Sequence, residues 1–83
     1  MNIYVGNLDF KVNENDLVEL FEKYGSVDSA KIITDKYSGR SKGFGFVTME
    51  NQDEANNAIE ALNGTSINDR DITVNEAKPR KQF

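Results

Sequence analysis

The order of elements in this 83-residue sequence predicts an α+β fold: a sandwich of one four-stranded antiparallel sheet with two helices on one of its faces. Three observations support the prediction. Two segments have the apolar spacing of amphipathic helices, four short segments alternate as strands do, and together they follow the order β-α-β-β-α-β. A chain of this length has room for one modest core, so we expect a single domain.

The first strand and the first helix occupy the N-terminal third of the chain. Residues 3–5 alternate apolar and aromatic side chains and predict a strand. Asn13 followed by Asp16 resembles a capping box with Asp in place of the usual Glu. Apolar residues then recur at helical spacing over 17–24. Gly25 stands where a left-handed residue often ends a helix, and we expect it to do so here.

The middle of the chain predicts a long hairpin. Residues 27–34 are rich in β-branched side chains and predict the second strand. Residues 43–49 predict the third strand. The polar segment 35–41 joins the two strands, and Gly39 within it can adopt a positive φ.

The second helix and the last strand complete the pattern. Asn51 and Glu54 have the spacing of a second capping box. Apolar residues follow at helical spacing over 55–62, and the dipeptide 63–64 (Asn-Gly) should end the helix. Residues 72–75 alternate as a fourth strand. This is the ferredoxin-like, or split βαβ, order. Its right-handed crossovers place both helices on one face and leave the other face open.

Alternation along the strands decides which side chains lie under the helices. The consistent assignment buries Ile3, Val5, Ala30, Ile32, Val47, Met49, Ile72 and Val74, and it turns Tyr4, Lys31, Phe44, Phe46, Thr73 and Asn75 to the open face. The opposite assignment would bury the charge of Lys31, which costs more than exposing an aromatic ring. Gly43 and Gly45 should then face the helices and allow their close approach. An exposed cluster of aromatic side chains usually marks a binding surface.

Composition removes several function classes. The sequence has no cysteine and no histidine, so it lacks thiolate metal ligands, disulfides and the commonest general base. We therefore expect no metal, no cofactor, no small-molecule substrate and no enzymatic activity. We see no signal peptide and no apolar stretch of transmembrane length.

Two segments resemble the signatures of the RNA recognition motif family. Residues 42–49 (Lys-Gly-Phe-Gly-Phe-Val-Thr-Met) are similar to its octamer, with Met49 in place of the usual aromatic residue. Residues 3–8 (Ile-Tyr-Val-Gly-Asn-Leu) are similar to its hexamer. The resemblance covers almost the whole chain, and we expect the domain at 1–78 and a short basic tail at 79–83.

The resemblance implies binding of single-stranded RNA, with single-stranded DNA left open as a second ligand. It implies that Tyr4 and Phe44 each stack one base, that Phe46 lies against the sugars between them, and that Lys42 pairs with a phosphate. Further contacts are expected from Lys31, Asn75, Lys78 and Arg80. The implied protein is a monomer with a post-transcriptional role in the cytoplasm, or in the nucleus of a eukaryote, and it has no membrane partner.

The net charge of the chain argues against RNA binding, but the distribution of its charged residues along the sequence is compatible with it. The net charge is -4 and the pI about 4.7, whereas nucleic-acid binding usually needs a basic face. The segment 31–42 nevertheless has a local balance of +3, and residues 77–83 add another +3. The helical segments 13–24 and 50–62 have balances of -3 and -4. We therefore expect acidic residues on the helix side and basic residues near the open sheet.

Two rival functions compete with RNA binding. Some domains of this family bind peptides, so a protein-interaction module of the same fold is the alternative. Small acyl-phosphate hydrolases share the element order but need an arginine in a phosphate cradle, and the turn at 6–9 has none. A metal carrier of this fold needs paired cysteines. Phe10 is expected to pack where the chain enters the first helix rather than to contact a ligand.

Overall fold

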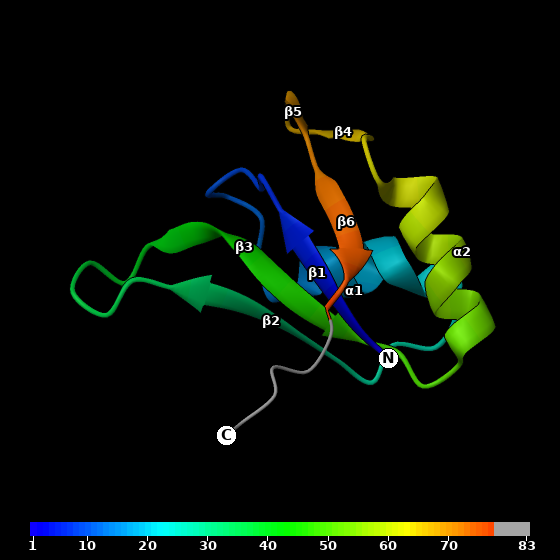
Figure 1. The fold of residues 1–83 in the computed structure, drawn as a ribbon. Coiled ribbons are helices and arrows are strands. Elements are labelled where there is room, and N and C mark those ends of the chain that lie inside the picture. Colours follow the sequence, from blue (N-terminus) through cyan, green and yellow to red (C-terminus); the bar gives the residue numbers. More distant parts are fainter. Residues whose placement is uncertain (78–83) are drawn as a thin grey trace, which may run out of the picture.

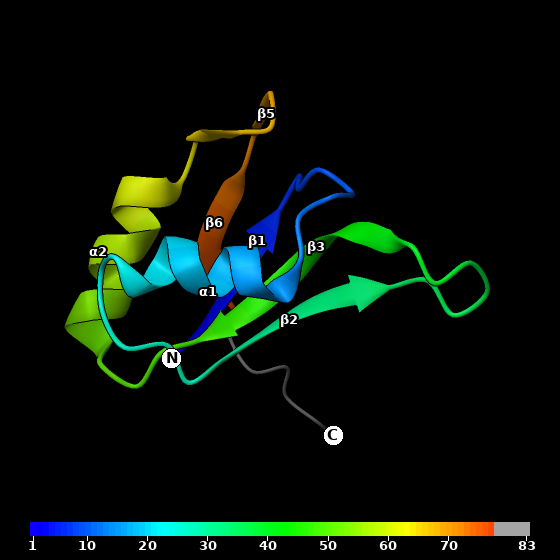
Figure 2. The same cartoon turned by 180° about the vertical axis from the view of Figure 1, so that it is seen from behind.

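One antiparallel sheet and two helices form the body of the protein, whose computed structural model describes residues 1–77. The strands β1 (Asn2–Gly6), β2 (Ser29–Thr34), β3 (Ser41–Thr48) and β6 (Thr73–Glu76) lie in the order β2-β3-β1-β6. Every neighbouring pair is antiparallel. Helix α1 (Glu14–Glu22) lies behind the sheet in Figure 1 and in front of it in Figure 2, and helix α2 (Gln52–Leu62) lies beside β6, at the right of Figure 1 and the left of Figure 2. The predicted fold is confirmed.

The core lies between the sheet and the helices, and it contains the strand residues that alternation assigned to this side. Six of the eight predicted residues are fully buried, namely Ile3, Val5, Val47, Met49, Ile72 and Val74. Ala30 and Ile32, on the edge strand β2, are half-buried and pack against them. Helix α1 contributes Leu17 and Phe21, and α2 contributes Ala55, Ala58 and Leu62.

The two predicted capping boxes have different outcomes. At α1 the box is complete: the Asn13 side chain accepts from the Asp16 N–H at 2.9 Å, and the Asp16 carboxylate accepts from the Asn13 N–H at 3.0 Å. At α2 only half forms, because the Glu54 N–H donates to Asn51 at 2.9 Å but the Glu54 carboxylate turns elsewhere. It accepts from the Ser26 N–H at 3.3 Å and so connects α2 to the loop after α1.

The two glycines expected to end helices also differ. Gly64 has φ +83, as a left-handed helix stop requires. Gly25 is not among the positive-φ residues, so the prediction that it ends α1 in a left-handed conformation is wrong. A Cβ atom at position 25 would collide with the Glu54 side chain. Glycine is needed there for the close approach of that carboxylate, which a single-helix pattern cannot reveal.

A second, two-stranded sheet was not anticipated from the sequence. The strands β4 (Ser66–Ile67) and β5 (Arg70–Asp71) form a hairpin whose two turn residues, Asn68 and Asp69, have φ of +52 and +65. Positive φ at both turn positions is the geometry of a type I′ hairpin, and Asn and Asp tolerate it better than most residues. The hairpin projects beyond the main sheet, next to the start of β6 (Figure 1).

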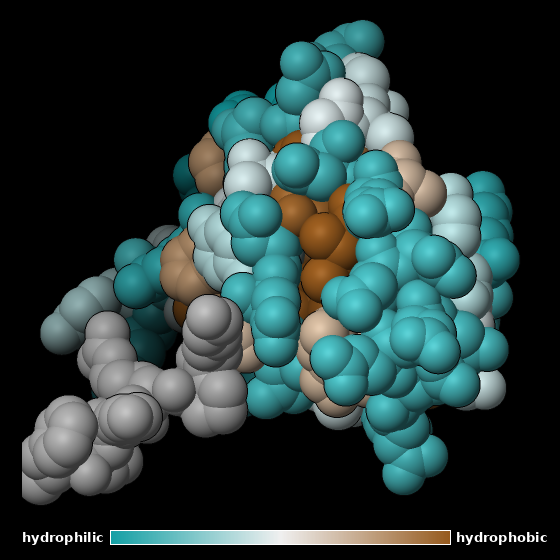
Figure 3. Space-filling model, turned by 45° about the vertical axis from the view of Figure 1, so that its right-hand side comes forward, coloured by the Kyte–Doolittle hydropathy of each residue, from teal (hydrophilic) through white to brown (hydrophobic). Residues whose placement is uncertain are grey.

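The surface around the helices is mainly polar. Figure 3, which brings the α2 side of the molecule forward, shows hydrophilic side chains interrupted by a narrow apolar strip. No helix within residues 1–77 has the length and apolar character needed to cross a membrane.

Candidate nucleic-acid interface

A continuous row of four side chains crosses the face of the sheet that has no helix. The strand register pairs Lys31 on β2 with Phe46 on β3, Phe46 with Tyr4 on β1, and Tyr4 with Asn75 on β6. Directly paired residues in a sheet point to the same face. The row is therefore a surface with a cation at one end, two rings at its centre and an amide at the other end.

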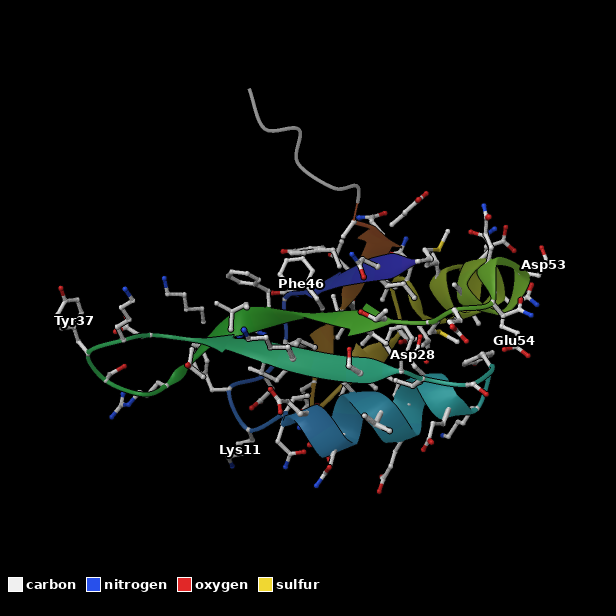
Figure 4. The ribbon with its side chains drawn as sticks, turned by 90° about the horizontal axis from the view of Figure 1, so that it is seen from below. Lys11, Asp28, Tyr37, Phe46, Asp53 and Glu54 are labelled. Carbon is white, nitrogen blue, oxygen red and sulfur yellow. The ribbon has the colours of Figure 1, made fainter. Side chains whose placement is uncertain are left out.

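Phe44 adds a third ring beside this row. The ring centroids of Tyr4 and Phe44 are 6.0 Å apart, those of Tyr4 and Phe46 are 5.9 Å apart, and those of Phe44 and Phe46 are 6.3 Å apart. These separations are within the range of favourable aromatic pairs. None of the three rings belongs to the buried core, and each is half-buried. In Figure 4, Phe46 points away from the helices into the space above the sheet.

The Tyr4 ring lies over Gly6, two residues further along β1. A Cβ atom built at Gly6 would meet the Tyr4 hydroxyl oxygen, and it would lie 2.7 Å from the ring atoms Cε2 and Cζ. Any side chain at position 6 would therefore displace this ring. In the sequence Gly6 stands out only as one residue of the hexamer, and this role could not be predicted, since the contact depends on the direction of the Tyr4 side chain.

Gly43 and Gly45, on either side of Phe44, are needed for the path and pairing of the strands and not for the approach of the helices. Gly43 has φ +85 and lies where the register of β2 and β3 shifts, at a bulge between Ile32 and Thr34. Its carbonyl accepts from the Leu8 N–H at 2.8 Å. A Cβ atom at Gly45 would collide with the Lys31 carbonyl oxygen on the neighbouring strand. The expectation that both glycines make room for helices is wrong, because their nearest neighbours are a loop and strand β2.

The structure describes only two of the four basic residues that were predicted to contact RNA. Lys31 and Lys42 are both exposed, and Lys42 lies close enough to Asp35 to help lower the pKa of that carboxyl. The stronger causes of this lowered pKa are hydrogen bonds from the backbone N–H groups of Tyr37 and Ser38. Lys78 and Arg80 lie outside the described residues.

A polar clamp fixes the small hairpin at the end of β1. Asn7, with φ +56, donates from its amide nitrogen to the Asp71 carbonyl at 2.7 Å and accepts from Arg70 Nη2 at 2.8 Å. Sequence reasoning overlooked Arg70 because the hairpin that carries it was not predicted. The only sequence signal was the Asn-Asp pair at 68–69, a turn-forming dipeptide between short strand segments.

Phe10 is the exception among the aromatic predictions. It was expected to pack where the chain enters α1, but its side chain is 69% exposed. It lines a shallow groove together with Glu14 and Ile32 at the edge of the sheet. The Glu14 carboxylate accepts from the Ile32 N–H at 3.1 Å, so it covers part of the edge strand β2.

The helix side of the molecule differs electrostatically from the open face. The first turns of α1 and α2 contain Glu14, Asp16, Asp53 and Glu54, and neither helix has a basic residue in its last turn. Within residues 1–77 no polar or charged residue is buried, and no group of three or more acidic residues could hold a metal ion. The ionisable groups of the described chain therefore act at its surface.

Comparison with known proteins gives consistent matches. The profile of a family described as RNA recognition motif matches residues 3–73. RbpA of Synechocystis sp. is 51% identical over 81 residues, which cover 98% of this chain and 80% of that protein. The chloroplastic 28 kDa ribonucleoprotein of Spinacia oleracea is 46% identical over 83 residues, but the chain spans only 36% of its length.

Solved structures agree with the sequence matches. The crystal structure of RNA binding protein PG1 superposes with a TM-score of 0.93 at 50% identity and covers 99% of both chains. A structure described as the Sxl-lethal protein/RNA complex has a TM-score of 0.90 at 27% identity, over 98% of this chain and 48% of that one.

Proposed function

The chain belongs to the RNA recognition motif family, and from this we propose that it binds single-stranded RNA on the open face of its sheet. The observation that carries the proposal is the cluster of three rings, within 6.3 Å of one another by centroid, on the face without helices. Bases in a single strand expose their faces to water, and aromatic rings on an open sheet offer a stacking surface in exchange.

Each residue of the platform has a distinct proposed role. Tyr4, held over Gly6, and Phe44, next to the β3 bulge, each stack one base. Phe46 stands between them in the cross-sheet row and contacts the sugars that link the two bases. Lys42 pairs with a phosphate. Lys31 and Asn75, at the two ends of the row, bias the choice of base through hydrogen bonds.

Stacking alone does not give tight binding. Each stack contributes about 1–3 kcal/mol, so two stacks contribute about 2–6 kcal/mol. Micromolar affinity needs about 8 kcal/mol. The remainder comes from phosphate contacts and from the residues that follow β6, among them Lys78 and Arg80. We therefore expect weak to moderate affinity and limited sequence preference.

Charge asymmetry orients the RNA toward the sheet. The local balance of +3 over residues 31–42 attracts phosphates, and the acidic first turns of both helices repel them. If about three phosphates are neutralised, the logarithm of the binding constant should fall with the logarithm of salt concentration with a slope of about -2.

The boundaries and the setting of the domain are part of the proposal. Residues 1–78 form the RNA-binding domain, residues 79–83 are a short basic tail, and residues 76–80 add contacts to the bases. The protein is a monomer, and its role is post-transcriptional. A cytoplasmic location stays a prediction, since the relatives include proteins described as chloroplastic. Binding of single-stranded DNA as a second ligand is left open.

A residue-by-residue NMR titration tests the location of the site. Unlabelled single-stranded RNA of mixed sequence is added to the ¹⁵N-labelled protein, and amide shifts are followed. The largest shifts should fall on β1 and β3, with smaller ones on β2 and β6, and the exposed faces of α1 and α2 should stay unchanged. Shifts confined to the helices would contradict the proposed site, and the absence of any shift at low salt would favour the alternative, a protein-interaction module.

A further inference from the structure

Tyr37 is an aromatic residue that neither the fold nor the sheet platform uses. It lies at the tip of the loop that joins β2 to β3, and its side chain is 100% exposed. Figure 1 shows this loop projecting beyond the sheet, and Figure 4 shows Tyr37 on the same side of the sheet as Phe46, away from the helices. A fully solvated ring gains no burial energy on folding, so packing does not explain its position.

Hydrogen bonds within the loop hold the backbone that carries this ring. The Asp35 carboxylate accepts from the Tyr37 N–H at 2.7 Å and from the Ser38 N–H at 3.2 Å. The Asp35 N–H donates to the Arg40 carbonyl at 2.7 Å, and the Gly39 N–H donates to the Asp35 carbonyl at 2.9 Å. The ring is thus presented on a turn that is already formed, which reduces the entropy lost when a ligand binds.

The charges around Tyr37 suit a polyanion. Lys36 precedes it and Arg40 follows it, and both are exposed. The one acidic residue of the loop, Asp35, has its carboxylate engaged by the loop backbone. A nucleotide stacked on the ring would therefore have cations within reach of its phosphates. An aromatic ring flanked by cations is the combination that binds single strands without strong sequence preference.

We propose that Tyr37 stacks on a base of the same RNA strand, outside the platform of Tyr4, Phe44 and Phe46. Figure 4 shows Tyr37 at the tip of the β2–β3 loop and Phe46 over the sheet, so the two rings are set apart along the hairpin. The base at Tyr37 is therefore a different base from the two on the platform. This inference rests on the proposed function and extends the binding site along the β2–β3 hairpin.

The test compares a short and a long RNA. Fluorescence anisotropy is measured with single strands of about 4 and about 12 nucleotides, within the range of site sizes known for single-strand binding folds. Tyr37→Ala should weaken binding of the long strand by at least about fivefold, the lower limit for one base–aromatic stack. It should leave the short strand unaffected. Tyr37→Phe should bind both strands like wild type, and Phe10→Ala is the control for an exposed aromatic residue elsewhere.

The outcomes separate this inference from the proposed function. Unchanged binding of the long strand by Tyr37→Ala would overturn the inference, and so would an equal loss for both strands. Phe44→Ala, measured in parallel, should weaken both strands whatever Tyr37 does. If wild type binds neither strand, the proposed function fails and the inference fails with it. The Ser38 amide signal in Tyr37→Ala shows whether the loop has kept its hydrogen bonds.

Discussion

Replacing Gly6 with alanine should disable the Tyr4 platform without unfolding the protein. The new Cβ atom would lie 2.7 Å from two Tyr4 ring carbons, whereas ordinary contacts begin near 3.4 Å. The ring must therefore move away from its position over β1. Because Gly6 is not a positive-φ residue, alanine brings no backbone strain. Gly6 is the last residue of β1, so alanine should gain less than the about 0.5–1 kcal/mol that it gains over glycine in the middle of a strand, and this gain partly offsets the packing energy that the displaced ring gives up.

The expected result is a split between affinity and stability. Binding of single-stranded RNA should weaken by about 1 kcal/mol or more, about fivefold, since a stack contributes about 1–3 kcal/mol. The free energy of unfolding should change by less than about 1 kcal/mol. Fluorescence anisotropy gives the first quantity and urea unfolding the second.

A double-mutant cycle assigns the loss to the Tyr4 ring. Gly6→Ala is measured alone, Tyr4→Ala is measured alone, and the two are then combined. If the methyl group acts through the ring, it has nothing further to remove in the Tyr4→Ala background, and the two losses should not add. Wild-type affinity of Gly6→Ala would refute this reasoning. An undiminished loss in the Tyr4→Ala background would refute it as well.

Four further predictions concern the caps, the bulge, the loop and salt. Asn13→Ala removes the capping box of α1 and should cost about 0.5–2 kcal/mol in urea unfolding, whereas Asn15→Ala, on the exposed surface of the same helix, should cost nothing. Gly43→Ala places a side chain at φ +85 and should cost about 1–2 kcal/mol by the same assay; a neutral effect would show that the bulge relaxes. The carboxyl of Asp35 should titrate below its usual pKa of 3.8 in an NMR pH series that follows the Tyr37 amide. Since the folded pKa is the lower one, the hydrogen bonds of the loop should be complete above the usual pKa and should break as pH falls through the folded value; a midpoint at or above 3.8 would contradict them. RNA affinity measured from low to moderate salt should fall with a slope of about -2 in a plot of the logarithm of the binding constant against the logarithm of salt concentration. A slope near zero would show that the protein makes no phosphate contacts.

The open face was predictable from sequence because strand alternation is a local property. Lys31 and Asn75 could not be buried without partners, so the phase of two strands was settled by charge and polarity alone. The phase of β3 then placed Phe44 and Phe46 on the same side as Tyr4. The structure places these residues on the open face, and register brings Lys31, Phe46, Tyr4 and Asn75 into one row.

Features that depend on side-chain direction were not predictable. Glu54 has the spacing of a capping box, but its carboxylate reaches the Ser26 N–H on another element. Gly25 looked like a helix stop and is instead the space into which that carboxylate fits. Gly43 looked like a small residue under a helix and is instead the positive-φ residue of a bulge. In each case a tertiary contact or a backbone angle decided the role of the residue.

The small β4–β5 hairpin shows a different limit. Its strands have two residues each, too few for alternation to be recognised. The hydrogen bonds that connect it to the main sheet come from Asn7, which is more than 60 residues away in sequence. Only the turn residues at 68–69 were visible beforehand, and a polar dipeptide alone fits many loops.

The central claim is that half-buried rings on the open sheet bind RNA, and Phe44→Ala tests it most directly. Anisotropy with single-stranded RNA of mixed sequence should show a loss of about 1–3 kcal/mol of binding relative to wild type. Urea unfolding should show a stability loss well below the about 3–5 kcal/mol that truncation of a core phenylalanine costs. Phe10→Ala, the control at an exposed aromatic residue that is not part of the ring cluster, should change neither quantity. Unchanged RNA affinity in Phe44→Ala, or a core-sized loss of stability, would contradict the account.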